Sequence, residues 1–265
     1  MAAKIDPMHQ FTVEPLVPLH VGGYDISFTN SAAWMLLALG AIALFMWGGM
    51  KRQMVPGRWQ VAVEGLTGFI DDMVGVNIGP EGKKFAPYIF SLFVFILASN
   101  MLGLLPLGIV PGHEAFTPTS HFSITGVLAV VSFSIVLLVG FWLHGLKLFT
   151  LFMPPGLPLF GQLALFPIEF VSFMVRPFSL GLRLFVAMTA GHILMTVFGN
   201  FTVLGLDSFV GAPATGNGVL GLAVGVLSFA FVLFVAALEI LVCAIQAYVF
   251  ALLTTLYLND VIHLH

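Results

Sequence analysis

The chain has 265 residues, of which 59% are hydrophobic and only 8% are charged, and its mean hydropathy is +1.07. Roughly a quarter of the residues of a soluble domain are charged, so this composition excludes a water-soluble single domain and predicts a protein of the lipid bilayer. The net charge of −3 is too small and too scattered to indicate a nucleic-acid partner. The single cysteine, Cys243, excludes an internal disulfide and a thiolate metal site.

The first 50 residues predict a polar tail followed by one membrane helix. Residues 1–29 carry scattered charges and prolines, and they lack the basic and apolar regions of a cleaved signal peptide. Residues 30–50 contain no charge and are followed directly by Lys51 and Arg52. A helix of this length rises about 31 Å, which matches the thickness of one hydrocarbon core.

Residues 58–78 have the pattern of an amphipathic helix. Apolar residues recur at helical spacing, and Glu64, Asp71 and Asp72 are interspersed among them. Such a helix is typical of the membrane interface. A soluble connector helix fits the same pattern nearly as well.

Residues 86–143 predict a transmembrane hairpin followed by an irregular connection. The stretches 88–105 and 122–143 are free of charge, and a loop rich in Pro, Gly and Thr separates them. Residues 144–166 are also apolar but contain Lys147 and several prolines. Proline lacks a backbone N–H, so a continuous helix here would lose hydrogen bonds. We expect a Pro-broken connection there, either re-entrant or interfacial.

Two apolar stretches near the C-terminus, 167–206 and 219–258, are too long for ordinary membrane spans. Each would rise about 60 Å as a helix, twice the thickness of the hydrocarbon core. Either both are broken, or both are tilted well beyond the ordinary angle of about 20°. The tilted alternative makes residues 167–265 a helical hairpin with a short tail. The predicted fold is then an all-α polytopic membrane protein with an N-terminal span, an interfacial amphipathic helix, a transmembrane hairpin and a long, strongly tilted helical hairpin.

The distribution of Lys and Arg predicts the orientation of these spans. Basic residues lie between the first span and the hairpin, and again just after the hairpin, whereas the loops 106–121 and 207–218 contain none. Because cytoplasmic loops carry the excess of basic residues, we expect the N-terminus outside and the C-terminus in the cytoplasm.

Five ionisable residues lie within the two overlong stretches, where each is costly and therefore a functional candidate: Glu169, Arg176, Arg183, His192 and Glu239. Glu169 and Arg176 lie near the cytoplasmic start, where an interfacial salt bridge or snorkelling explains them as well as a channel role does. Within the stretch 167–206, 16 residues precede Arg183 and 23 follow it. Its guanidinium therefore cannot reach either membrane surface. It must face protein, water or an anion.

The partners of these residues are predicted from helix geometry. No acid lies within one turn of Arg183, so we expect its partner on another helix or another subunit. His192 emerges on the face opposite Arg183, and antiparallel packing would bring Glu239 to its level. A carboxylate beside an imidazole would form a proton relay, whereas a lone membrane histidine is more often simply packed and hydrogen-bonded. Neither metal-ligand spacing nor a nucleophile or nucleotide motif is present, so we expect no cofactor, no metal and no enzyme activity in the chain itself.

Two motifs carry a resemblance to a known family. They are SLGLRLF at 179–185 and IQAYVF at 245–250, supported by PIE at 167–169 and NMLGLLP at 100–106. With these motifs the chain resembles subunit a of the rotary F-type ATP synthases, in the alphaproteobacterial and mitochondrial branch. The resemblance covers most of the chain from residue 58 onward.

The resemblance implies a proton-translocating stator subunit that forms two half-channels against a ring of c subunits and couples proton flow to rotation and ATP synthesis. It implies that Arg183 holds the ring carboxylate and separates the half-channels, that His192 and Glu239 form the inlet, that Glu169 marks the outlet and that Gln246 supports the region of Arg183. The implied partners are the c-ring, the peripheral-stalk b subunits, the lipid bilayer and, indirectly, the catalytic head. The implied location is the bacterial inner membrane, or secondarily the mitochondrial one.

The sequence is also compatible with two other classes of protein. One is a self-contained secondary transporter in which Arg183 binds an anionic substrate, and the other is a membrane scaffold in which Arg183 is only structural. The chain also departs from some bacterial members of the family, because Gly103 and Ala187 stand where those members have polar residues. No channel role is therefore assigned to these two positions.

Overall fold

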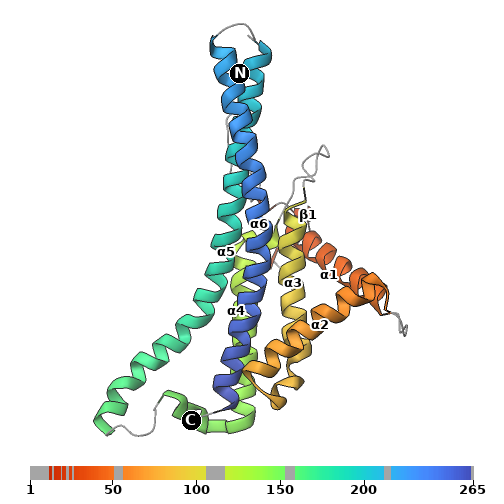
Figure 1. The fold of residues 1–265 in the computed structure, drawn as a ribbon. Coiled ribbons are helices and arrows are strands. Elements are labelled where there is room, and N and C mark those ends of the chain that lie inside the picture. The colour runs from red at the N-terminus through yellow and green to blue at the C-terminus, as the bar shows by residue number, and fades with distance from the viewer. Residues whose placement is uncertain are drawn as a thin grey trace. The chain divides into compact units, whose positions relative to one another are not determined.

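The computed structural model describes residues 12–13, 15–18, 20–21, 24–25, 27–50, 56–105, 117–152, 159–211 and 216–263. Within these ranges the chain is helical apart from four short strands and the connecting turns (Figure 1). The α-helices are α1 (Asn30–Gly49), α2 (Arg58–Asn77), α3 (Ala86–Gly103), α4 (Phe122–His144), α5 (Leu159–Gly211) and α6 (Gly216–Ile262). The 3₁₀ helices are η2 (Pro80–Lys84), η4 (Pro118–Ser120) and η5 (Gly145–Phe152).

Five of the described helices, α1, α3, α4, α5 and α6, are long and apolar enough to cross a membrane. The all-α polytopic class predicted from composition is therefore confirmed. Several features of the sequence analysis lie outside the described residues, namely Lys51 and Arg52, the loop 106–116, the prolines at 154, 155 and 158, and the turn 212–215.

The chain forms two compact units that share α5 and α6. The first unit comprises residues 1–35, 99–121 and 186–245, and the second comprises residues 36–98, 122–185 and 246–265. In α5, residues 159–185 belong to the second unit and residues 186–211 to the first unit. In α6, residues 216–245 belong to the first unit and residues 246–262 to the second unit.

The N-terminal tail contains two small antiparallel sheets in the first unit, where the sequence analysis predicted only a polar tail. Strand β1 (Pro15–Val17) pairs with β4 (Phe28–Thr29), and β2 (His20–Val21) pairs with β3 (Tyr24–Asp25). Val and aromatic residues favour extended backbone. Strands this short leave no clear alternation in the sequence.

Helix α5 starts earlier than the sequence predicted. It begins at Leu159, inside the expected Pro-broken connection 144–166, and runs through Pro167 and Pro177. Proline removes one backbone hydrogen bond and strains the preceding turn, but membrane helices tolerate it because neighbouring groups and local adjustments satisfy the freed carbonyl. The 3₁₀ helix η5 occupies the start of the same connection.

Both overlong stretches are continuous helices in the structure. Helix α5 has 53 residues and α6 has 47 residues, which correspond to about 80 Å and 70 Å of helix rise. Neither is broken into two shorter spans.

In the second unit, α4 packs closely on its neighbours through small residues and hydrogen bonds. The Tyr88 hydroxyl on α3 donates to Ser132 Oγ on α4 at 2.9 Å. Gly181 on α5 faces α4, because a Cβ placed there would lie 3.0 Å from the Thr125 carbonyl oxygen. Gly140 leaves room for Val261, whose side chain is fully buried. These contacts fix the part of α5 that carries Arg183.

In the first unit, the second half of α5 approaches α6 at glycines. A Cβ on Gly205 would lie 2.5 Å from the Gly221 carbonyl oxygen and 2.6 Å from the Gly225 Cα. Small residues permit such close approach of two backbones in a membrane. The rings of Phe198 and Phe231 stack nearby with their centroids 5.2 Å apart.

Candidate functional site

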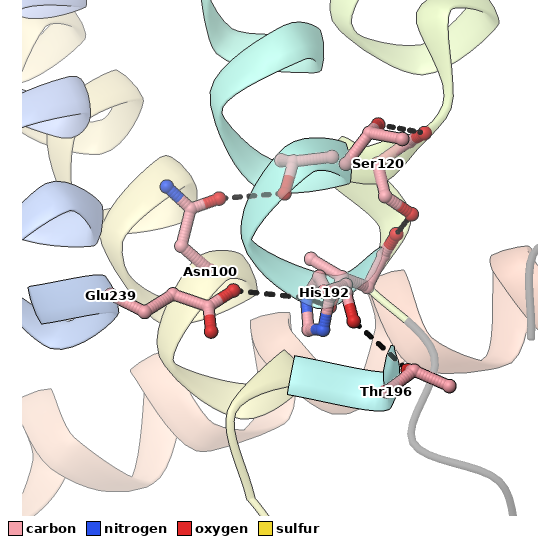
Figure 2. Close-up of polar contacts among 8 residues, drawn as sticks. Asn100, Ser120, His192, Thr196 and Glu239 are labelled. Carbon is pink, nitrogen blue, oxygen red and sulfur yellow. Dashed lines mark hydrogen bonds and ion pairs between the residues drawn. The ribbon is translucent and has the colours of Figure 1, made fainter. Parts of the chain in front are cut away.

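A buried polar cluster lies in the first unit around His192 (Figure 2). His192 comes from α5 and Glu239 from α6, and their side chains point toward one another, with Nε2 3.8 Å from Oε1. Both residues are buried, at 7% and 3% exposure. The structure thus brings together the two residues that helix geometry predicted to meet.

A third residue, Thr117, completes the surroundings of His192. Its Oγ1 lies 2.7 Å from His192 Nε2, at the start of the segment that leads into η4. Gly103 faces this hydroxyl so closely that a Cβ there would overlap Thr117 Oγ1. Glycine at position 103 therefore makes room for the hydroxyl that contacts the imidazole. Sequence reasoning missed Thr117, for which the threonine-rich loop was the only signal.

Asn100 and Ser99 extend the cluster from the end of α3. The Thr119 hydroxyl donates to Asn100 Oδ1 at 2.6 Å, and Asn100 and Ser99 are fully buried. Four buried polar atoms here have no hydrogen-bond partner among the described residues: Asn100 Nδ2, Ser99 Oγ and both carboxylate oxygens of Glu239. Buried polar groups normally find a partner in protein or ordered water. Four such atoms without a partner make the interior around His192 unusually polar for helices as apolar as α3, α5 and α6.

Two more residues lie close to the cluster in the chain or in the fold, Thr189 and His121. The Thr189 hydroxyl donates to the Ser120 carbonyl oxygen at 3.1 Å, which ties α5 to η4. His121 follows η4, and burial lowers the pKa of its imidazole below the usual value. Burial therefore favours the neutral form of this histidine.

Arg183 lies in the second unit on an exposed position of α5. Its neighbours Leu180 and Leu184 are buried against the core, whereas the Arg183 side chain faces outward. It makes no hydrogen bond or ion pair with any residue that the structure describes. A guanidinium in the middle of an apolar helix needs a partner, and within the described chain none is supplied.

Gln246 and Glu169 also belong to the second unit, and both are half-buried. Neither is joined to Arg183 by a hydrogen bond or ion pair in the described part of the chain. Sequence reasoning gave Arg176 an interfacial salt bridge as one alternative. The structure contains a salt bridge of this residue, because Arg176 NH1 lies 2.7 Å from Asp260 Oδ2.

Comparison with known proteins decides the family. The model of the ATP synthase A chain family matches residues 32–259. The chain belongs to this family. Its A-chain relatives include the ATP synthase subunit a of Sphingopyxis alaskensis, which is 59% identical over 100% of this chain and 98% of the relative. The subunit a of Erythrobacter litoralis is 57% identical over 100% of this chain and 98% of the relative. That of Rhodospirillum rubrum is 44% identical over 98% of this chain and 99% of the relative.

Membership of the A-chain family confirms the resemblance drawn from the two motifs and does not favour the transporter alternative. Among the described residues of this A chain, no group of three His, Cys, Asp or Glu side chains could hold a metal ion. Among the described residues, Thr117, His192 and Glu239 form a buried polar cluster, and Arg183 is an exposed cation within the apolar helix α5.

Proposed function

We propose that this A chain is the proton-translocating stator subunit of an F-type ATP synthase, in which it forms two half-channels against the c-ring. The observation that carries the proposal is Arg183, an exposed guanidinium in the middle of an apolar helix with no partner in the described chain. Such a charge is costly in hydrocarbon unless another molecule supplies the opposite charge. The chain catalyses no chemical reaction itself but couples proton flow to ring rotation and thereby to ATP synthesis.

The inlet half-channel is assigned to the cluster around His192. Its imidazole faces Glu239 Oε1 at 3.8 Å and the Thr117 hydroxyl at 2.7 Å. The buried oxygens of Glu239 and the amide of Asn100 can bind water, which carries protons between fixed groups. A proton entering from the outer side passes His192 and Glu239 and then protonates a carboxylate of the ring.

Arg183 is assigned two connected tasks. Its planar fork of donors binds a deprotonated ring carboxylate with two parallel hydrogen bonds, and its permanent positive charge stabilises that carboxylate. The same charge repels protons, so it prevents direct passage between the two half-channels. Each proton is therefore forced to travel with the rotating ring.

The outlet half-channel is assigned to Glu169. This residue is half-buried and lies on the same helix as Arg183, 14 positions toward the start of α5, or about 21 Å along its axis. A carboxylate at that distance can accept protons that the ring releases near the cytoplasmic surface. Gln246 on α6 supports the Arg183 region as a neutral hydrogen-bonding group.

The membrane arrangement follows from helix length and charge. A helix of 53 residues cannot stand upright in about 30 Å of hydrocarbon, so α5 and α6 are proposed to form a strongly tilted hairpin against the ring. The absence of Lys and Arg from loops 106–121 and 207–218 supports an N-terminus outside and a C-terminus in the cytoplasm. The peripheral-stalk b subunits and, indirectly, the catalytic head complete the assembly in the bacterial inner membrane.

Affinity isolation in mild detergent tests the proposal against a self-contained transporter. We expect an oligomeric ring of small proteolipids to co-purify with the chain, and we expect no transport by the chain alone after reconstitution. A transporter would instead move an anionic substrate without the ring. Isolation of the chain free of any ring, with substrate transport on its own, would contradict the proposal.

A further inference from the structure

Arg176 is held by a set of contacts that the proposed channel does not use. Its NH1 lies 2.7 Å from Asp260 Oδ2, which belongs to the last turn of α6. Its guanidinium carbon lies 5.4 Å from the ring centroid of Phe173 and 5.2 Å from that of Tyr257. All four residues belong to the second unit. The charge of Arg176 is therefore both paired and stacked.

Asp260 is itself held in place by the end of α6. The His144 side chain on α4 donates from Nε2 to the Ile262 carbonyl oxygen at 3.1 Å. Val261, adjacent to Asp260, is fully buried against the space left by Gly140. The carboxylate is thus positioned by the packing of its neighbours, and it does not depend on Arg176 alone for its location.

Arg176 and Arg183 lie on the same face of α5. They are seven positions apart. This spacing is within about 20° of two full helical turns and corresponds to about 10 Å along the helix axis. Tyr257 lies within electrostatic range of both guanidinium groups. A molecule that docks on this face of α5 therefore meets two arginines in line.

The two arginines differ in one respect that matters for a docking anion. Arg183 has no ion-pair partner among the described residues, whereas Arg176 has Asp260. A guanidinium never loses its charge under physiological conditions. If it were unpaired, Arg176 would attract the same carboxylate as Arg183, at a position displaced toward the start of α5.

We propose that Asp260 is a positioning residue that neutralises Arg176, so that Arg183 is the one guanidinium on this face of α5 available to a ring carboxylate. The inference rests on the proposed function, because it needs a ring carboxylate that binds Arg183. The half-exposed pair contributes little to folding stability, as is usual for such salt bridges. The role of the Arg176–Asp260 pair is to determine the position along α5 at which the ring carboxylate binds.

The test is a double-mutant series in the assembled ATP synthase, with ATP-driven proton pumping and assembly measured together. Asp260→Asn keeps the shape of the side chain but leaves Arg176 unpaired, so we expect pumping to fall roughly tenfold in an assembled complex. Adding Arg176→Gln to this variant removes the competing charge and restores pumping to the level of Arg176→Gln alone. That single variant should pump nearly as well as wild type, because Arg183 remains.

A purely structural salt bridge predicts a different pattern. Arg176→Gln, Asp260→Asn and the double variant would then be equally impaired, because each of them breaks the same bridge. Equal impairment, or wild-type pumping by Asp260→Asn, would overturn the inference. If Asp260→Asn does not assemble, Arg176→Gln still decides, since near-normal pumping supports the inference and strong loss overturns it.

Two control variants separate this inference from the proposed function. Asp207→Asn makes the same chemical change at an exposed position of α5 and should leave pumping unchanged. Arg183→Ala tests the ring contact itself. If Arg183→Ala abolishes pumping while Asp260→Asn pumps normally, the inference about Asp260 fails alone. If Arg183→Ala pumps normally, the proposed function fails with it.

Discussion

The Nε2 atom of His192 lies 3.8 Å from Oε1 of Glu239, although the two side chains come from different helices. This distance is longer than a hydrogen bond between nitrogen and oxygen, which spans 2.7–3.2 Å. Proton transfer between the two groups therefore needs either a small movement or one bridging water. The Thr117 hydroxyl lies 2.7 Å from the same nitrogen and holds the imidazole in place.

Replacing Glu239 with Gln should slow ATP-driven proton pumping by at least about tenfold, because a neutral amide keeps the shape but cannot carry a proton. Assembly of the complex should be retained, since the carboxylate makes no hydrogen bond within the described chain. Pumping is measured in inverted vesicles, and Asp207→Asn, at an exposed position, serves as the control. Unchanged pumping in an assembled Glu239→Gln complex would remove this residue from the pathway.

Gly191 should matter because of the carboxylate beside it. A Cβ at this position would lie 2.7 Å from Glu239 Oε1 and 2.9 Å from its Cδ. Gly191→Ala must therefore displace the Glu239 carboxylate, which is the end of a flexible side chain, and we expect reduced pumping in a complex that still assembles. Gly199→Ala on the same helix meets nothing within 4 Å and should pump normally. Equal rates in the two variants would show that the position of the carboxylate is not critical.

The close contact of α5 and α6 at glycines should affect the stability of the assembled complex and not the rate of proton transfer. A Cβ on Gly205 would lie 2.6 Å from the Gly225 Cα, and backbone atoms cannot move aside as a flexible side chain can. Gly205→Ala should lower the amount of assembled complex and its thermal stability. Gly211→Ala meets nothing within 4 Å and provides the matched comparison. Normal stability of the Gly205 variant would mean that the two helices separate easily at this point.

Orientation is tested by cysteine labelling with an impermeant thiol reagent. The native Cys243 is fully buried and is first replaced by Ala. Cysteines at Asp207 and Lys84, both exposed positions, should react from opposite sides of the membrane. Thr119 is a poor labelling site because only 1% of its surface is exposed. Labelling of both cysteines from the same side would contradict the proposed orientation.

The helices could be predicted largely from apolar stretches. The sequence predicts the first span at 30–50 and the structure has it as Asn30–Gly49, because an uncharged run followed by two basic residues leaves few alternatives. The start of α5 was not predicted, because Pro167 normally ends a helix in water but is accommodated within this long one. The small sheets of the tail were missed because strands of two or three residues carry too little pattern.

The site was predictable only in part, for a related reason. Arg183, His192 and Glu239 stand out in the sequence because ionisable residues are rare in apolar stretches. Thr117 and Asp260 did not stand out, since a hydroxyl in a polar loop and an acid near the chain end are both ordinary. Their importance comes from partners that lie 75 and 84 residues away, at His192 and Arg176. Such pairings are set by how the helices pack and not by local pattern.

Charge alone does not describe what Arg183 must do. Arg183→Lys keeps the positive charge but loses the planar fork, and a lysine can lose its proton when it is buried. We therefore expect this variant to be severely impaired in ATP-driven pumping while assembly is retained. Near-normal pumping by Arg183→Lys together with misassembly of Arg183→Ala would instead indicate a structural arginine.

Arg183→Ala, with coupled pumping and passive proton leak measured on the same assembled complex, tests the proposed role of Arg183. The proposed role predicts that coupled pumping and ATP synthesis are lost and that the leak through the membrane sector rises, because the carboxylate partner and the barrier between the half-channels disappear together. Robust coupled pumping by this variant, with no increase in leak, would contradict the account.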